Sequence, residues 1–190
     1  MALTYLSVRH GNKYGPEYTE VLKKQVPGLI VLGDDREFLN PGRYIGWWSK
    51  LEIFAPENRD LRPCLFIDLD TFVFDLTPFE DIDHEQFWLI NDFHLPNIGE
   101  SGLFIAPKYG ISDQIWEQAE HLASQGPFQG EDGRFLRQFP HKRLNDVISG
   151  ILSYKVDLVD SPRGRIVCFH GRPKMPDAEG WAKDRWNTLL

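Results

Sequence analysis

Apolar runs alternate with polar, turn-rich stretches along the first part of the chain, and this pattern predicts short strands separated by helices. Leu3 to Val8 predicts a buried strand, and Leu29 to Leu32 predicts a second one. Between them Pro16 suits a first helical turn. Helical spacing then joins Tyr18, Val21, Leu22 and Val26. This order indicates a sheet covered by helices, with ligands bound beyond the strand ends.

The central part of the chain combines an aromatic helix pattern with the most apolar strand. The stretch GWWSKLEIF predicts a helix that places Trp47, Trp48, Leu51 and Phe54 on one face. Cys64 to Ile67 then predicts a buried strand that leads directly into Asp68-Leu69-Asp70. The apolar segment TFVF follows as a further strand.

The second half of the chain continues the alternation and completes the sheet. Strands are predicted at Phe87 to Ile90, Gly102 to Pro107, Val156 to Val159 and Arg165 to Phe169. Helices are predicted around Ile111, Ile115, Ala119 and Leu122, and over Gly130 to Phe139. The sequence shows no repeat or linker, so we expect one α/β domain over residues 1–190.

Composition narrows the function classes. Hydrophobic residues make up 42% of the 190 residues and charged residues 26%, which is typical of a globular domain. The net charge of −7 argues against a broadly basic nucleic-acid surface, so an anionic ligand must be met by a metal or a few cations. No apolar run approaches the roughly 20 residues of a membrane span, and we expect a cytoplasmic location. Cys64 and Cys168 lie in apolar runs and predict buried thiols without a disulfide.

Asp68 and Asp70 follow a buried strand at the point where it meets solvent. Because the chain turns at a strand end, two aspartates spaced by one residue can face the same metal ion there. Carboxylate oxygens suit Mn²⁺ or Mg²⁺, and an acidic protein needs such a cation to hold a phosphate. We therefore predict a metal site, with a solvated pair of acids as the alternative.

A second polar segment, CFHGRPKMP, follows the last predicted strand. His170 can supply an imidazole ligand to the same metal, Gly171 permits close backbone approach to a phosphate, and Lys174 adds a positive charge. Taken alone, a histidine after a strand is more often structural. Its combination with the two aspartates favours a ligand role.

The chain resembles glycosyltransferases of the GT-A fold, in particular the retaining family-eight group that includes glycogenin and bacterial galactosyltransferases. The resemblance rests on FIDLDTFVFDL, on the histidine-glycine-lysine segment and on NKYGPEY after the first strand. It implies a mixed central sheet flanked by helices and a metal-dependent transfer of a hexosyl group from a nucleoside-diphosphate sugar, with UDP as the expected nucleotide. The resemblance implies that Tyr14 stacks on the uracil, and we include Arg9 of the same polar loop among the nucleotide-sugar contacts.

The resemblance also assigns the sugar pocket. The segment ESGLFIAP is similar to the family's turn of small residues, which places Ser101 and Gly102 at the sugar. Gly130-Glu131-Asp132 approximates a D-Q-D segment, which makes Glu131 or Asp132 the candidate for steering the sugar or stabilising the cationic carbon. Solvated acids at a helix start are the alternative. Lys50 is a further candidate for the diphosphate, and a surface lysine is its alternative.

Two other classes fit parts of the pattern. Haloacid-dehalogenase-type phosphatases use a strand-end D-x-D whose first aspartate is the nucleophile, but they place it on the first strand and follow it with Thr or Val where Phe72 stands here. A sugar-nucleotide or carbohydrate-binding module that has lost transfer is the non-enzyme alternative. The donor sugar, the acceptor, the stereochemical outcome and the oligomeric state cannot be predicted from the sequence.

Overall fold

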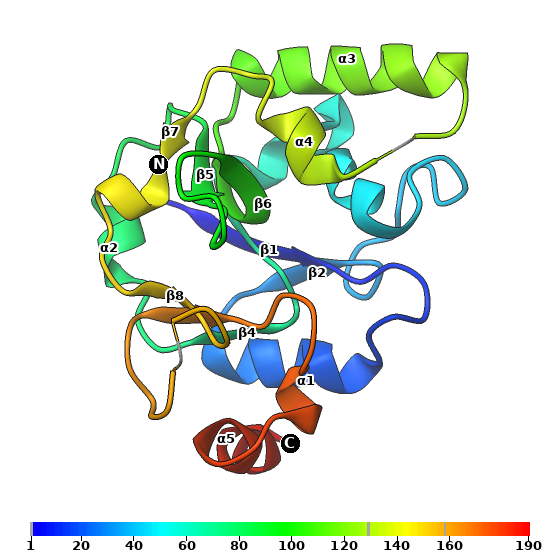
Figure 1. Ribbon diagram of the computed structural model, residues 1–190. Helices are drawn as coiled ribbons and strands as arrows, with labels where there is room; N and C mark the ends of the chain where they lie inside the picture. The colour runs from blue at the N-terminus through cyan, green and yellow to red at the C-terminus, as the bar shows by residue number, and fades with distance from the viewer. Residues whose placement is uncertain (1, 129, 158) are drawn as a thin grey trace.

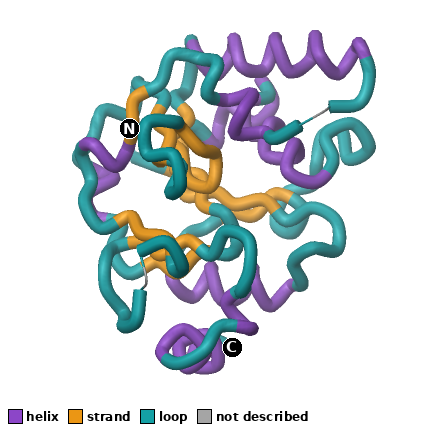
Figure 2. The backbone as a smooth tube through the Cα atoms, in the orientation of Figure 1, coloured by secondary structure: helices purple, strands orange, loops and turns teal. Residues whose placement is uncertain are grey.

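Two β-sheets form the centre of the molecule, and helices cover both sides of them (Figure 1; Figure 2). The computed structural model describes residues 2–128, 130–157 and 159–190. The larger sheet contains, in spatial order, β2 (Ile30–Leu32), β1 (Thr4–Val8), β3 (Cys64–Ile67), β6 (Gly99–Ala106), β5 (Trp88–Asn91) and β7 (Lys142–Arg143). The smaller sheet contains β4 (Thr71–Val73), β9 (Ile166–Cys168) and β8 (Ile151–Ser153).

The larger sheet is mixed. β1 pairs in parallel with β2 and β3, whereas β6 runs antiparallel to both β3 and β5, and the β5·β6 register shifts between Leu89 and Ile90. The expected α/β architecture with a mixed central sheet is therefore confirmed. The helices are α1 (Pro16–Gln25), α2 (Thr77–Glu80), α3 (Ile111–Gln125), α4 (Asp132–Leu136) and α5 (Trp181–Leu189), with 3₁₀ helices η1 (Gly46–Phe54), η2 (Pro56–Leu61), η3 (Leu144–Asp146) and η4 (Met175–Asp177).

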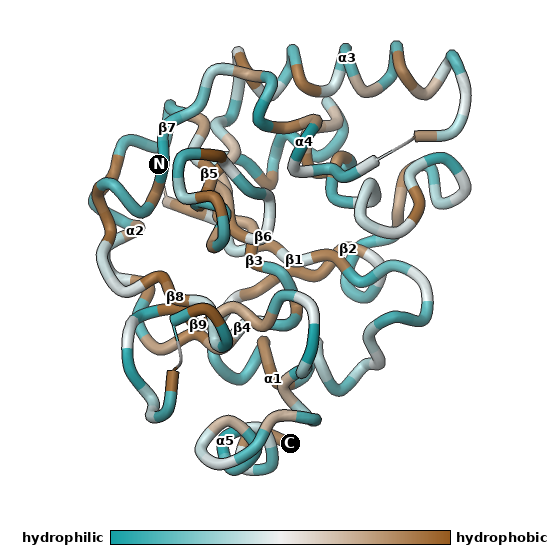
Figure 3. Tube along the Cα trace, in the orientation of Figure 1, coloured by the Kyte–Doolittle hydropathy of each residue, from teal (hydrophilic) through white to brown (hydrophobic). Residues whose placement is uncertain are grey.

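Strand β3 is apolar throughout because both of its faces are buried. Leu65 and Ile67 pack into the core beneath α1 and α5, whereas Cys64 and Phe66 pack into the core beneath η1 and α3. All four side chains are at most 1% exposed. Alternate side chains of a strand point to opposite faces, so a strand covered on both sides needs a continuous apolar run. Most of the strands accordingly coincide with hydrophobic segments in Figure 3.

The helix predictions after the first and sixth strands are confirmed in kind and place. α1 begins at Pro16, whose fixed φ suits the first turn, and the Tyr18 ring packs 4.9 Å from the Trp186 ring of α5. In α3, Ile115 and Ala119 are spaced by one helical turn, and both face the hydrophobic core. Among the described residues, no helix combines the length and the apolar character needed to cross a membrane.

The predicted strand at residues 156–159 is wrong in its described part. Residues 154–157 form a turn, Leu158 lies outside the described residues, and the strand of this region is β8, a few residues earlier. The Asp157 carboxylate accepts a hydrogen bond from the Ser153 backbone N–H at 2.6 Å, and the Asp157 N–H donates to the Ser153 carbonyl at 3.1 Å. This local turn therefore prevails over the apolar pattern.

Two further predictions need correction. The strand predicted at residues 165–169 exists as β9, but it pairs with β4 and β8 in the smaller sheet and does not extend the main one. The stretch GWWSKLEIF forms a 3₁₀ helix, and the helix predicted over residues 130–139 is limited to α4. In the tighter helix Trp48 is buried, whereas Trp47 is 54% exposed.

Candidate active site

The Asp68-Leu69-Asp70 segment connects the two sheets, because β3 belongs to the larger sheet and β4 to the smaller one. Leu69 is 1% exposed and packs into the core. Backbone hydrogen bonds fix both ends of the segment, from Asp68 N–H to the Gly102 carbonyl at 3.0 Å and from Phe169 N–H to the Asp70 carbonyl at 2.8 Å. Both aspartates consequently line a cavity of about 810 Å³.

This cavity brings together most of the site residues expected from the sequence. Its walls include Tyr14, Lys50, Asp68, Asp70, Ser101, Gly102, Glu131, Asp132, His170, Gly171 and Lys174. Arg9 is not part of the lining. Its guanidinium Nε donates to both carboxylate oxygens of Asp34, at 2.8 and 2.9 Å.

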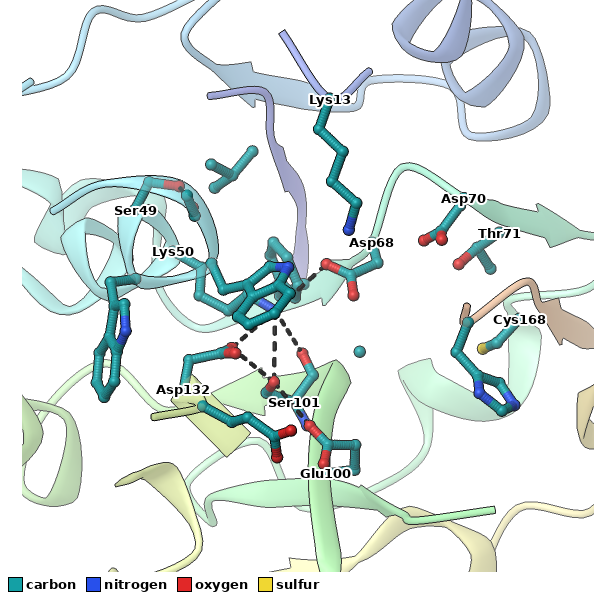
Figure 4. A pocket seen from close by; sticks show the side chains of 18 of the residues that line it. Lys13, Ser49, Lys50, Asp68, Asp70, Thr71, Glu100, Ser101, Asp132 and Cys168 are labelled. Atoms are coloured by element: carbon teal, nitrogen blue, oxygen red, sulfur yellow. Dashed lines mark hydrogen bonds and ion pairs between the residues drawn. The ribbon is translucent and has the colours of Figure 1, made fainter. Parts of the chain in front are cut away.

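Lys50 is the centre of a charged cluster in the cavity (Figure 4). Its ammonium lies 2.9 Å from Asp132 Oδ2 and 3.3 Å from Asp68 Oδ1. The same ammonium donates to the Ser101 carbonyl at 3.2 Å, and Ser101 Oγ donates to Asp132 Oδ2 at 2.6 Å. The lysine side chain is only 7% exposed, so it is not a surface lysine.

Burial and charge act in opposite directions on these groups. Burial alone lowers the pKa of Lys50, but the carboxylates of Asp132 and Asp68 outweigh it and hold the pKa above its ordinary value. Burial raises the pKa of Asp68 to about 6; Lys50 opposes this shift, while Asp70 and Asp132 add to it. A cation delivered to Asp68 would therefore relieve an unfavourable negative charge.

Asp70, Tyr14 and Lys174 form a second cluster. The Lys174 ammonium contacts the Asp70 carboxylate and donates to the Phe169 carbonyl at 3.0 Å. Tyr14 donates from its hydroxyl to Asp70 Oδ2 at 2.9 Å, and burial raises the pKa of this tyrosine. The Tyr14 ring packs 4.8 Å from the Tyr18 ring, so the loop after β1 is held against α1.

His170 lies on another part of the wall, where its ring is held on three sides. Its Nε2 lies 2.6 Å from Ser153 Oγ, Phe93 stacks on the ring at 5.1 Å, and His94 meets it edge-on at 5.5 Å. Burial, followed by Lys155 and His94, lowers the pKa of His170 and favours the neutral imidazole that binds metals.

The described residues contain no ready-made cluster of three His, Cys, Asp or Glu side chains placed to hold a metal. Each of the three expected ligands nevertheless keeps one atom without a hydrogen bond to a described residue, namely Asp68 Oδ2, Asp70 Oδ1 and His170 Nδ1. Two carboxylates and a neutral imidazole are a suitable donor set for Mn²⁺. The chemistry of the donors fits a metal, although the three groups do not yet converge.

The glycines keep the cavity open. A Cβ at Gly102 would lie 3.5 Å from Asp68 Oδ2, which is ordinary contact but would fill the space beside that carboxylate. Gly171 has φ +70°, which side chains disfavour, and a Cβ there would approach the Lys155 ammonium to 2.7 Å. The backbone conformation therefore favours glycine at residue 171, whereas the glycine at residue 102 leaves space beside Asp68.

Several lining residues were not predicted. They include Lys13, Trp47, Phe93, His94, Glu100 and Phe128. Lys13 and Glu100 are immediate sequence neighbours of predicted site residues, so their position next to Tyr14 and Ser101 could have identified them as lining residues. Phe128 reaches the cavity wall because its ring stacks on the Trp48 ring at a centre-to-centre distance of 4.3 Å. The two residues are far apart in sequence, so the residue pattern within one segment cannot predict this contact.

The strand order, the two sheets and the cavity at the Asp68-Leu69-Asp70 connection define the fold of GT-A glycosyltransferases. The galactosyltransferase LgtC, solved in complex with donor and acceptor sugar analogs, superposes with a TM-score of 0.64 at 14% identity, covering 98% of this chain and 95% of LgtC. The glycosyltransferase GlyE of Streptococcus pneumoniae gives a TM-score of 0.62 at 13% identity, covering the whole chain but 61% of GlyE. No protein-family model and no curated protein matches the sequence.

Proposed function

We propose that this protein is a glycosyltransferase that moves a hexosyl group from a nucleoside-diphosphate sugar, with UDP as the nucleotide, to an acceptor hydroxyl. The observation that carries the proposal is the cavity between the two sheets, which gathers carboxylates and ammonium groups from the loop after β1, η1, the β3–β4 connection, β6 and the segment after β9. The GT-A fold supports the same reaction class. A site of this size accommodates a nucleotide sugar.

The difficult event in such a transfer is the departure of the diphosphate from the anomeric carbon. Positive charge develops on the sugar and negative charge on the β-phosphate. Lys174 and Lys50 line the cavity, and their positive charges can stabilise the departing phosphate. Tyr14, Ser101, Gly102 and Gly171 line the same cavity and would contact the nucleotide and the sugar.

A divalent Mn²⁺ or Mg²⁺ is part of the proposal. Asp68, Asp70 and His170 would hold it, because each retains a ligand atom free of hydrogen bonds to the described residues. When bound, the metal would supply Lewis-acid stabilisation of the diphosphate.

Glu131 and Asp132 are proposed for the sugar itself. Asp132 is 5% exposed, and Lys50 neutralises its charge. This ion pair fixes the position of the Asp132 carboxylate, which could then accept hydrogen bonds from sugar hydroxyls. Glu131 precedes α4, lines the cavity and makes no side-chain cap to that helix, so its carboxylate is available to the cationic carbon. The alternative of merely solvated acids does not suit Asp132, which is buried.

Thermal unfolding with UDP, GDP, ADP and CDP, each with and without Mn²⁺, tests the proposal. A ligand at 100 times its dissociation constant should stabilise the protein by about 2.7 kcal/mol. A Mn²⁺-dependent shift with UDP, followed by slow hydrolysis of a UDP-hexose, would support the transferase. Binding without hydrolysis or transfer would favour a binding module, whereas turnover of a simple phosphate ester without any nucleotide effect would revive the phosphatase.

A further inference from the structure

The cavity contains three lysine ammonium groups, and two of them are already paired. Lys50 lies between Asp132 and Asp68, and Lys174 contacts Asp70. Lys13 makes no hydrogen bond and no ion pair with any residue in the described ranges. Its ammonium is therefore the cavity cation that remains available to a ligand.

Two aromatic rings flank this ammonium. The Lys13 Nζ lies 4.8 Å from the centre of the Tyr14 ring and 5.7 Å from the centre of the Trp47 ring. Figure 4 shows the side chain extended into the cavity toward Asp68, without an ion pair to it. Cation–π contacts of this kind orient an ammonium and leave its N–H donors free for an anion.

The electrostatic surroundings favour an anion beside Lys13. Partial burial, followed by the charge of Lys174, lowers the pKa of Lys13, while the carboxylates of Asp70 and Asp68 only partly compensate. A phosphate between Lys13 and Lys174 would neutralise both ammonium groups at once. The Lys13 ammonium also lies 4.8 Å from the centre of the Tyr14 ring, on which we expect the base of the nucleotide to stack.

We infer that Lys13 is a diphosphate-binding residue, held between the Tyr14 and Trp47 rings and acting together with Lys174. The inference rests on the proposed function for the identity of the nucleotide, but a bare diphosphate would satisfy the same contact. Lys13 contributes to ligand affinity through charge. The contribution therefore vanishes for a nucleoside without phosphates.

Calorimetric titration of the full chain in one Mn²⁺ buffer tests the inference. The probes are UDP, uridine and inorganic pyrophosphate. The variants are Lys13→Met, which keeps the length of the side chain and removes its charge, and Lys13→Arg, which restores the charge. Lys142→Met is the matched control, because Lys142 is an exposed lysine 5.3 Å from the centre of the Trp88 ring and does not line the cavity.

The expected result is a loss of roughly tenfold or more in affinity for UDP and pyrophosphate in Lys13→Met. Uridine binding should not change, Lys13→Arg should recover most of the affinity, and Lys142→Met should behave as the wild type. Unchanged UDP and pyrophosphate affinity in Lys13→Met would overturn the inference and leave the proposed function standing. Lys13-dependent binding of pyrophosphate without any binding of UDP would support the inference and reject the proposed function. A wild-type protein that binds neither UDP nor pyrophosphate would reject both.

Discussion

The Lys50 ammonium lies 2.9 Å from Asp132 Oδ2, and both side chains are only 7% exposed. The pair joins η1 to the start of α4, two elements more than 80 residues apart in sequence. A buried ion pair contributes little to stability as a whole, but the removal of one partner leaves the other charged and unpaired. Lys50 therefore stabilises the same cavity in which we propose that it acts.

Lys50→Met should destabilise the fold by about 3 kcal/mol, because Asp132 and Asp68 both lose their buried cation. Urea unfolding measures the change. The double variant Lys50→Met with Asp132→Asn should recover at least about 1 kcal/mol of the loss. If the free energy of unfolding of the single variant equals that of the wild type, Lys50 does not neutralise Asp132 and Asp68 in a buried cluster.

Asp70→Asn and His170→Ala should each remove the Mn²⁺-dependent part of UDP binding while the protein stays folded. Both residues retain a free ligand atom in the cavity, and these substitutions remove ligands without placing bulk in the core. Titration of UDP with Mn²⁺ and with EDTA, beside circular dichroism, separates the two effects. A full Mn²⁺ response in both variants would rule out this ligand set.

Gly102→Ala should abolish transfer with little effect on folding. The new methyl group would lie 3.5 Å from Asp68 Oδ2 and 3.6 Å from Ile90 Cδ1, which the strand tolerates, but it would fill the space beside the proposed metal ligand. Gly33→Ala is the contrasting variant, since Gly33 has φ +97° and its Cβ would lie 2.2 Å from the Arg9 carbonyl oxygen. That variant should lose more than about 2 kcal/mol of stability, whereas Gly102→Ala should lose less than about 1 kcal/mol.

Cys64 and Cys168 should resist thiol reagents in the native protein. Burial raises the pKa of Cys64 to about 12 and raises the pKa of Cys168 as well, so the reactive thiolate is scarce at neutral pH. Ellman's reagent should label Cys64 only as fast as the protein unfolds and should react slowly with Cys168, which lines the cavity and is 6% exposed, whereas urea should make labelling of both immediate. Rapid labelling of the native protein would show that one thiol is accessible.

Most strands of the main sheet could be predicted because burial on both faces requires continuous apolar runs, as in Cys64 to Ile67, but the edge strand β7 consists of Lys142 and Arg143 and was not predicted. Assignment of strands to sheets could not be predicted in the same way. β4 and β9 are as apolar as the main strands, and pairing between segments about 95 residues apart depends on tertiary packing. The turn after Ser153 shows the converse, since one aspartate hydrogen bond decides the local structure.

The proposed site could be predicted where the chemistry lies next to a strong structural signal. Asp68 and Asp70 follow a buried strand, and the structure places both of them in the cavity. Arg9 follows an equally clear strand, yet a nearby aspartate in the loop after β2 holds its guanidinium away from the cavity. The partner of a charged side chain depends on distant loops, and the spacing of residues in one segment does not reveal it.

The connection from β3 to β4 is short, and it ties the two sheets together through the proposed metal ligands themselves. Relative movement of the sheets can therefore change the separation of the two carboxylates. A ligand that fixes this separation would hold the two sheets together, and amide hydrogen exchange in the smaller sheet would slow when the ligand binds. The stability of the smaller sheet would thus report the occupancy of the cavity.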